Sequence, residues 1–480
     1  MHLSLGVIIR SRVIAAIAAL ALLSSGAPAM VQAARFVTPA VGVHPQVVYA
    51  GQSTAAVFGC QYIRPGRLQC YNPQQVRKAY GIQNLLDGGL TGKGRTIVIV
   101  DAYQSPTIAA DLKTFDKTFG LKDPPFQQVA PDGLTAWDPT NSNMEGWAEE
   151  ISLDVQWSHA VAPDAKIVLV LAKSNNDSDI LSATKYAVDH NLGDVISQSF
   201  GEAESCVDPA LMTQEHKLFE TATMKGITLV ASSGDQGAAQ YTCDGTDLIL
   251  SASSPASDPL VTGVGGTNLV AGPEGCSSTV SPVTPIPCPA PYNVPAGTYI
   301  SENAWNDARL AAYGDPDHGY SGGGFSTIYS RPFYQAGVSG IPRASRGVPD
   351  VAYDAGLDGG VLTYLGFLAD VPDGQGGFFS NGFYIFGGTS AGSPQWSGLV
   401  ALADQAIRGR VGSINPVLYS IYYDTRLYKS VFHDIRSGNN NFFHADGSDL
   451  VGYKAAVGWD PVTGLGTPNF DKVVGRLTGH

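Results

Sequence analysis

A serine stands at the turn between a strand-like stretch and a helix-like stretch in the last quarter of the chain. The strand-like residues 384–386 lead into Gly-Gly-Thr-Ser-Ala at 387–391, and an apolar, helix-like segment follows at 395–408. The glycines allow a tight turn and the close approach of a substrate carbonyl. The following helix presents its unpaired N–H groups and partial positive charge to an oxyanion beside Ser390. These features predict a nucleophilic serine, and the alternative is an ordinary glycine-rich turn.

A serine hydroxyl is a poor nucleophile unless a base lies within hydrogen-bond reach and a third group holds that base. Histidine is the usual base, and the chain has nine histidines, none of which begins a His-Gly-Thr sequence that would open a helix. His159 is the nearest candidate, but it ends a predicted helix shortly before Pro163. That position is typical of a capping or packing residue, so a histidine base remains only an alternative.

Two carboxylates fit the role of the base better. Glu150 and Asp154 are four residues apart and therefore lie on one face of the helix predicted over 145–159. If they are partly buried, they share a proton, and one apparent pKa rises. Such a pair supplies a base and the group that orients it in an acidic medium. A second glutamate pair at 145 and 149 repeats the spacing, and a solvated acidic helix face is the alternative, although apolar neighbours favour burial.

Another carboxylate follows a predicted strand. Ala-Ser-Ser-Gly-Asp at 231–235 comes directly after the apolar run 227–230. Functional groups of open α/β sheets collect at the carboxyl ends of the strands. A protonated Asp235 can donate a hydrogen bond to an oxyanion, whereas an ionised carboxylate would repel it, so such a site would work only in acid. A turn or a helix N-cap is the alternative.

The elements that must position these residues alternate regularly along the chain. We expect strands at 96–100, 165–171, 194–198 and 227–231, and helices at 108–119, 145–159, 180–190 and 209–225. This alternation predicts an α/β fold, a doubly wound parallel sheet with helices on both faces. Residues 251–342 are rich in Gly, Pro, Ser and Thr and are expected to form surface loops around a single large domain.

The N-terminus predicts export. Arg10 and Arg12 precede an apolar run at 13–23, and small residues follow, so residues 1–34 are interpreted as a secretory signal peptide. A retained membrane anchor is the alternative. Residues 35–70 then form a short N-terminal extension. After signal removal we expect a protein with no membrane contact, secreted to the extracellular space or the periplasm.

Charge and cysteine content restrict the partners. The net charge is −13 and charged residues make up only 15% of the chain, so no basic surface is available for nucleic acid. The six cysteines are an even number in an exported chain, which predicts disulfides. Proximity in sequence favours Cys60–Cys70, Cys206–Cys243 and Cys276–Cys288. No pair has Cys-x-x-Cys spacing, so zinc is not expected.

Several further motifs occur with these residues in a fixed order. They are Glu150-x-x-x-Asp154, Ser-Gln-Ser-Phe-Gly at 197–201, Ser-Ser-Gly-Asp at 232–235, Val-Gly-Gly-Thr at 264–267, Ser-Gly-Gly-Gly-Phe-Ser at 321–326, Val-Pro-Asp-Val at 348–351 and Gly-Thr-Ser-Ala at 388–391. Over roughly residues 71–475 the chain resembles the sedolisin family, the serine-carboxyl peptidases with a subtilisin-like fold. Any one motif is weak, but their number in family order makes the resemblance strong.

The resemblance implies a role for each candidate. Ser390 would be the nucleophile, Glu150 the general base and Asp154 the acid that orients it. Asp235 would donate to the oxyanion together with the Ser390 backbone N–H. Asp101 ends the first predicted strand, but the family takes its third acid from the helix, so Asp101 is expected to lie outside the catalytic machinery.

The resemblance also implies a calcium loop near the C-terminus. Phe-His-Asp-Ile at 432–435 and Ala-Val-Gly-Trp-Asp at 456–460 match the family's Ca²⁺ site. The ligands would be the carboxylates of Asp434 and Asp460 and the backbone carbonyls of Ile435, Ala456 and Gly458, an oxygen shell that suits this ion. Ala456 replaces a frequent glycine, which a carbonyl ligand tolerates unless the position needs a positive φ. Without the resemblance, residues 460–464 are an ordinary turn.

One departure concerns the N-terminal region. Family members usually carry a prodomain of well over a hundred residues, whereas the peptidase-like region begins here near residue 71. We expect a sedolisin-like peptidase domain over 71–480, no full-size prodomain before it, and a monomer. The predicted function is a secreted, acid-active serine-carboxyl endopeptidase that hydrolyses unfolded proteins or peptides. The alternatives are a tripeptidyl-type exopeptidase and a catalytically silent binding protein with the same fold.

Overall fold

A computed structural model describes residues 38–39, 46–47, 57–63, 67–277, 286–308, 319–372, 376–442 and 449–479. The expected signal peptide at 1–34 lies outside these residues. So does most of 35–56, the first part of the expected extension at 35–70. Within the part that is described, no helix is both long enough and apolar enough to cross a membrane.

A large sheet forms the centre of the domain. Its strands run in the order β16-β14-β10-β8-β5-β7-β6, and β19 also pairs with β14. All neighbours are parallel except β14 and β16. The strands are β5 (Thr96–Ala102), β6 (Phe126–Val129), β7 (Lys166–Ala172), β8 (Val195–Gln198), β10 (Thr228–Ser232), β14 (Thr262–Ala271), β16 (Tyr299–Ala304) and β19 (Val351–Asp354).

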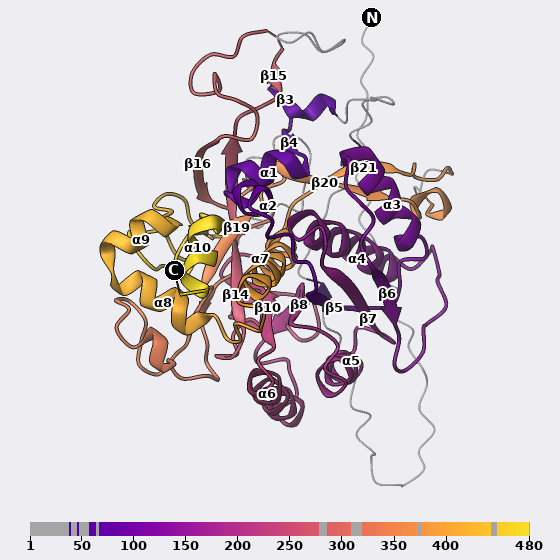
Figure 1. Cartoon of the computed structure of the whole chain (residues 1–480). Coiled ribbons are helices and arrows are strands. Elements are labelled where there is room, and N and C mark those ends of the chain that lie inside the picture. Colours follow the sequence, from indigo (N-terminus) through magenta and orange to yellow (C-terminus); the bar gives the residue numbers. More distant parts are fainter. Residues whose placement is uncertain are drawn as a thin grey trace, which may run out of the picture. The chain divides into compact units, whose positions relative to one another are not determined.

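Helices cover both faces of this sheet (Figure 1). The side chains of β5 alternate between two cores: Ile97 and Ile99 pack with α4 (Ser142–Val161) and α7 (Gly392–Ile407), whereas Val98 and Val100 pack with α5 (Asp177–Asp189) and α6 (Pro209–Met224). A strand buried on both faces must be apolar at every position, which explains its continuous apolar run. The predicted doubly wound α/β fold is confirmed.

The expectation of surface loops over residues 251–342 is wrong in one important part. The ten-residue strand β14 lies inside the sheet and pairs with β10, β16 and β19. This strand was not predicted from the sequence because it contains several glycines, and glycine is depleted in strands. They are there because neighbours lie close: a Cβ on Gly265 would stand 2.7 Å from Pro349, and one on Gly266 would stand 2.7 Å from Trp305.

Shorter elements surround the central layers. The remaining helices are α1 (Pro73–Ala79), α2 (Ile82–Asp87), α3 (Ile108–Phe119), α8 (Asn415–Tyr423), α9 (Thr425–Val431) and α10 (Phe470–Leu477). The other strands used below are β1 (Thr38–Pro39), β2 (Gln46–Val47), β9 (Phe200–Ala203), β11 (Ala239–Tyr241), β13 (Ser253–Ser254), β20 (Gly360–Leu365) and β21 (Gly382–Phe386). The extension joins this framework through its backbone, since β1 pairs with β9 and β2 with β21.

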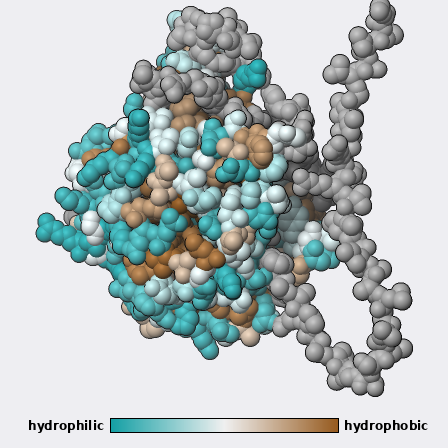
Figure 2. Space-filling model, turned by 90° about the vertical axis from the view of Figure 1, so that its right-hand side faces the viewer, coloured by the Kyte–Doolittle hydropathy of each residue, from teal (hydrophilic) through white to brown (hydrophobic). Residues whose placement is uncertain are grey.

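The structure contains the three disulfides expected from the sequence, Cys60–Cys70, Cys206–Cys243 and Cys276–Cys288. On the face in Figure 2, weakly polar and hydrophobic areas lie between the hydrophilic ones, in keeping with a chain in which only 15% of residues are charged.

Candidate active site

Ser390 lies at the point where β21 turns into α7. The turn depends on Gly388, whose φ of 101° is unfavourable for other residues and whose missing Cβ would stand 2.7 Å from Asp235 Oδ2. Ser390 is fully buried, and its hydroxyl donates to the carbonyl of Ser199 at 3.4 Å. The turn therefore fixes the serine against two other segments of the carboxyl edge of the sheet.

Helix α4 brings the two predicted carboxyl groups to the same place. It packs against α7, and both Glu150 and Asp154 are fully buried. The hydroxyl of Ser199 donates to Asp154 Oδ1 at 2.9 Å, so Ser199 contacts Ser390 with its carbonyl and Asp154 with its side chain. The burial expected from the apolar neighbours in α4 is confirmed, and a solvated helix face is excluded.

Burial controls the charge of both acids. It is the largest cause that raises the pKa of Glu150 well above its ordinary value, and the nearby carboxyls of Asp154 and Asp101 raise that pKa further. The Ser390 hydroxyl acts in the opposite direction. Neither Glu150 oxygen, however, has a hydrogen-bond partner at normal distance among the described residues. The serine is thus near Glu150, while its hydroxyl is directed to Ser199.

Asp154 is the second member of the pair. Burial, followed by the charge of Asp101, raises the pKa of Asp154 well above its ordinary value, and the hydrogen bond from Ser199 lowers it. Among the described residues, no lysine, arginine or histidine forms an ion pair with either acid. The cluster therefore reduces its charge by binding protons.

Asp101 was expected to lie outside the machinery, but the structure places it beside Glu150 and Asp154. It ends the central strand β5, is fully buried, and has no hydrogen-bond partner within the described part of the chain. Burial raises its pKa to about 8. Its position at the carboxyl end of a central strand was the sequence signal that could have included it in the cluster.

Asp235 approaches Ser390 from the other side. It follows β10, and its Oδ1 accepts hydrogen bonds from Thr389 N at 2.8 Å and Thr389 Oγ1 at 2.7 Å. The position that a Cβ on Gly388 would occupy lies 2.7 Å from Asp235 Oδ2 and 3.8 Å from the Ser390 backbone N. Asp235 Oδ2 and the Ser390 peptide N–H therefore both lie on the side of Gly388 where its Cβ is missing, which suits an oxyanion when the carboxyl is protonated.

One serine and one threonine of this site, Ser199 and Thr389, had no predicted role. Ser199 lay within a recognised motif, and Thr389 lay next to the predicted nucleophile, yet neither residue type indicates by itself which partner it will bind. His159, in contrast, lies away from the site: it is buried, and its Nε2 is 3.0 Å from Asp116 Oδ1. This contact fits the packing role expected for it.

The five residues of the expected calcium loop also lie together. Asp434 Oδ1 accepts from Gly458 N at 2.8 Å, and Asp460 Oδ2 accepts from Ala456 N at 2.9 Å, while Ile435 follows Asp434 in the chain. Gly458 has a φ of 83°, whereas Ala456 is absent from the positive-φ residues, so alanine is compatible there.

The carboxylates of this loop already have partners. Arg436 forms an ion pair with Asp434 Oδ2 at 2.7 Å, and the remaining oxygens of the two carboxylates accept from peptide N–H or hydroxyl groups. Burial raises the pKa of Asp460 to about 6. No group of three or more His, Cys, Asp or Glu that could hold a metal occurs among the residues with described positions. Any ion here would depend on two carboxylates and on backbone carbonyls, a set that fits Ca²⁺ in kind.

Comparisons with known proteins agree with this geometry. Residues 140–415 match the subtilase family (Peptidase_S8). The chain is 32% identical to kumamolisin from Bacillus sp. (strain MN-32) over 83% of its own length and 62% of the relative's. It is 27% identical to tripeptidyl-peptidase 1 from Dictyostelium discoideum over 84% of its length and 58% of that protein's. The chain thus spans less than two thirds of these relatives.

A solved structure gives the same result. Pseudomonas sedolisin, a serine-carboxyl proteinase complexed with two molecules of pseudo-iodotyrostatin, superposes with a TM-score of 0.66 at 28% sequence identity. The match covers 85% of this chain and 98% of that one. With its parallel sheet, its buried acids on α4 and the serine at the start of α7, the chain belongs to the subtilase family and, within it, to the sedolisin-type serine-carboxyl peptidases.

Proposed function

We propose that this protein is a secreted endopeptidase that is active in acid and cleaves unfolded proteins or peptides through an acyl-enzyme at Ser390. The observation that carries the proposal is the meeting of Ser390, Glu150 and Asp154 in a buried site, where Ser199 contacts both the serine and Asp154. The three disulfides favour an oxidising compartment and so support secretion.

The first chemical step forms the bond between Ser390 Oγ and the substrate carbonyl carbon. Ionised Glu150 accepts the hydroxyl proton, and Asp154 keeps the Glu150 carboxyl in place by sharing its own proton with it. The carbonyl oxygen becomes an oxyanion in the space beside Gly388, where protonated Asp235 and the Ser390 N–H donate to it.

The second step breaks the peptide bond. Glu150 returns the proton to the leaving amine, and the acyl group stays on Ser390. Water then attacks the ester: Glu150 takes one proton from the water and gives it back to Ser390 Oγ, which releases the acid product. Glu150 must be ionised and Asp235 protonated in the same molecule, so turnover requires a pH at which these two states coexist.

The test is the digestion of a denatured protein between about pH 3 and pH 8 by wild type and Ser390→Ala, with the fragments mapped by mass spectrometry. We expect internal fragments in acid from wild type and none from the variant. Ser393→Ala, three residues later in the first turn of α7, is a matched control for removal of a buried hydroxyl. Cleavage by Ser390→Ala would refute the nucleophile assignment.

An exopeptidase is the second candidate, because several similar proteins are named tripeptidyl-peptidases. Release of short N-terminal peptides without internal fragments would replace the endopeptidase proposal by this one. A silent binding protein is less well supported, since such a protein has no need to keep Ser390, Glu150, Asp154 and Asp235 together.

We also propose that the C-terminal loop binds Ca²⁺ through Asp434, Asp460 and the carbonyls of Ile435, Ala456 and Gly458. The ion would stabilise the loop and take no part in the chemistry. Arg436 pairs with Asp434 and would have to release it. A chelator should lower the Tm of wild type, and added Ca²⁺ should restore it. A wild-type Tm that the chelator leaves unchanged would refute the site.

A further inference from the structure

Two hydrogen bonds from one residue hold the carboxyl group of Asp235. Thr389 directly precedes Ser390, and its peptide N–H and its hydroxyl donate to Asp235 Oδ1 at 2.8 and 2.7 Å. Thr389 and Asp235 are both buried, so these bonds are shielded from water. A carboxyl oxygen that accepts two hydrogen bonds has both of its lone pairs engaged. The proton of the neutral carboxyl group is therefore directed to the other oxygen, Asp235 Oδ2.

The threonine hydroxyl is oriented by a second contact. The peptide N–H of Gly234 donates to Thr389 Oγ1 at 3.2 Å, so this oxygen accepts from Gly234 and donates its own hydrogen to Asp235. Gly234 is itself confined, because the position of its missing Cβ lies 2.4 Å from Gln240 Nε2 in β11. The hydroxyl of Thr389 is thus a donor with a fixed direction.

Asp235 Oδ2 lies on the side where the oxyanion is expected. The position of the missing Cβ of Gly388 is 2.7 Å from Asp235 Oδ2 and 3.8 Å from the Ser390 backbone N. A proton on Oδ2 can be donated to an oxyanion on this side, whereas a proton on Oδ1 would face Thr389. The oxygen that carries the proton therefore decides whether Asp235 can act as the donor.

We infer that Thr389 is a positioning residue, which directs the proton of Asp235 to Oδ2 and helps to set the upper pH limit of turnover. A hydroxyl donates a stronger hydrogen bond to an ionised carboxylate than to a neutral carboxyl group. Thr389 therefore also favours the loss of the proton that the oxyanion needs. This inference rests on the proposed peptidase mechanism, and it adds a residue that acts through Asp235 without touching the substrate.

The ionisable groups near Asp235 lie on several elements. Glu150 on α4 is close enough for the charge of Asp235 to raise the pKa of Glu150. Asp154 on the same helix and Asp101 at the end of β5 lie beside Glu150 in turn. Tyr320, in the segment that packs on Asp235, donates its N–H to the Asp235 backbone carbonyl at 2.9 Å. Since Glu150 must be ionised for turnover, its titration limits activity on the acid side and leaves the alkaline side to Asp235.

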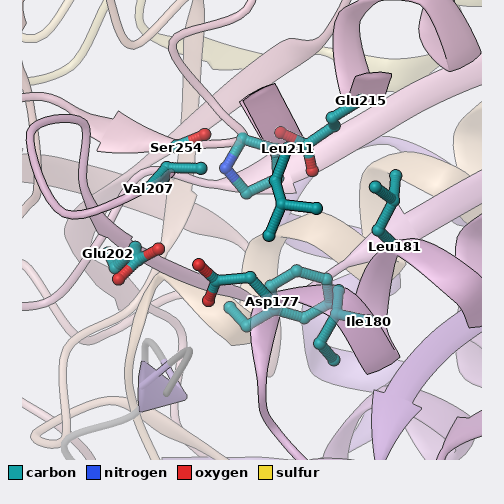
Figure 3. A pocket seen from close by; sticks show the side chains of 10 residues that line it. Asp177, Ile180, Leu181, Glu202, Val207, Leu211, Glu215 and Ser254 are labelled. Carbon is teal, nitrogen blue, oxygen red and sulfur yellow. The ribbon is translucent and has the colours of Figure 1, made fainter. Parts of the chain in front are cut away.

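A more distant group of acids offers a competing explanation for the upper limit. Asp177, Glu202 and Glu215 line a pocket between α5, α6 and β9, and Figure 3 shows their carboxylates around it. Burial raises the pKa of Glu215 to about 8, and a hydrogen bond from Ser254 in β13 acts against this rise. Because β9 follows Ser199 in the chain, ionisation in this pocket has to be tested separately.

The test compares the pH profiles of kcat/KM for wild type, Thr389→Val and Thr389→Ser between about pH 3 and pH 8. The substrate is a fluorogenic peptide that contains a bond cleaved by wild type in a denatured protein. Thr389→Val should raise the upper pH limit by about one unit, the effect of one hydrogen bond. It should also lower the maximal kcat/KM about tenfold, because Oδ1 then competes for the proton. Thr389→Ser keeps the hydroxyl and should retain both wild-type values.

Three further variants serve as controls. Thr228→Val removes another buried threonine hydroxyl, at the start of the strand β10 that leads to Asp235, and should leave the upper limit unchanged. Glu215→Gln should leave it unchanged as well. In an Asp235→Asn background, Thr389→Val should no longer move the limit, because the side chain at position 235 then has no proton to titrate.

An upper limit in Thr389→Val that equals the wild-type limit overturns the inference. So does a limit that moves equally in Thr389→Ser, or one that moves in Glu215→Gln instead. Thr389→Ala removes the same hydroxyl with less bulk and decides the question in the same way if Thr389→Val does not fold. If wild type cleaves nothing at any acidic pH, the proposed function fails and this inference falls with it.

Discussion

Two buried pairs of residues have the same spacing of four and contrasting surroundings. Arg346 and Asp350 are fully buried, and the guanidinium donates to both oxygens of Asp350 at 2.9 and 2.6 Å. Gly263 N and the Tyr419 hydroxyl also donate to this carboxylate. Glu150 and Asp154 are equally buried, yet no cation faces them among the described residues.

The presence or absence of a cation distinguishes a pair of residues that stabilises the fold from a pair that can exchange protons. A carboxylate that is paired with arginine keeps its charge over a wide pH range, because the opposite charge and the hydrogen bonds favour the ionised form. A pair of acids without a cation gains and loses protons as the pH changes. The chain uses the first arrangement to hold loops together, and the second where we propose that a proton moves.

Replacing the proposed general base, Glu150, should have the largest effect on activity. Glu150→Gln keeps the shape of the side chain but cannot accept a proton, so kcat/KM should fall about a thousandfold. The Tm should stay the same or rise, since a buried group that is costly to ionise becomes neutral. Kinetics and thermal unfolding measure the two effects. Glu145→Gln, on the same helix, should retain near wild-type activity, and an active Glu150→Gln would reassign the base.

Removing Arg346 tests whether the Arg346–Asp350 pair stabilises the fold. Arg346→Met leaves Asp350 buried without its cation and should lower the free energy of unfolding by about 3–5 kcal/mol. Urea unfolding measures the loss. Arg346→Met combined with Asp350→Leu should recover much of the stability, because no unpaired charge remains. A single variant as stable as wild type would show that Asp350 gains enough from its other donors.

A smaller effect should appear in the pH dependence of stability. Burial raises the pKa of Asp101 from 3.8 to about 8, so the folded protein binds this proton more tightly than the unfolded chain. The stabilisation is complete below about pH 4 and is lost as the pH rises toward 8. The Tm should therefore fall between these values, and less so in Asp101→Asn. A Tm that rises with pH would contradict the protonated cluster.

The sequence predicted the elements whose pattern is set by local forces. Four strands and four helices between 96 and 232 were recognised because buried parallel strands are continuously apolar and the helices between them are periodic. The short strands β6 and β9 in the same range were not predicted. Glu150 and Asp154 could be paired because helical spacing alone places them on one face.

What could not be predicted depends on contacts between distant segments. β14 was missed because it is rich in glycine. These glycines are required by close contacts with Pro349 and Trp305, which are far away in the sequence. The same holds for Ser199, which contacts Asp154 and Ser390 across the fold, and for Asp101 in β5, whose acidic neighbours lie on helix α4. Nothing in the local pattern around these residues carries that information.

The position of Ser199 between Ser390 and Asp154 has a consequence for how the protein unfolds and loses activity on heating. Together with the Thr389–Asp235 bonds, it links buried residues next to β9, α7 and β10 to helix α4. Such regions open only when the whole domain unfolds, so their amide hydrogens exchange slowest with solvent. Activity should therefore persist up to the global transition and be lost together with the fold.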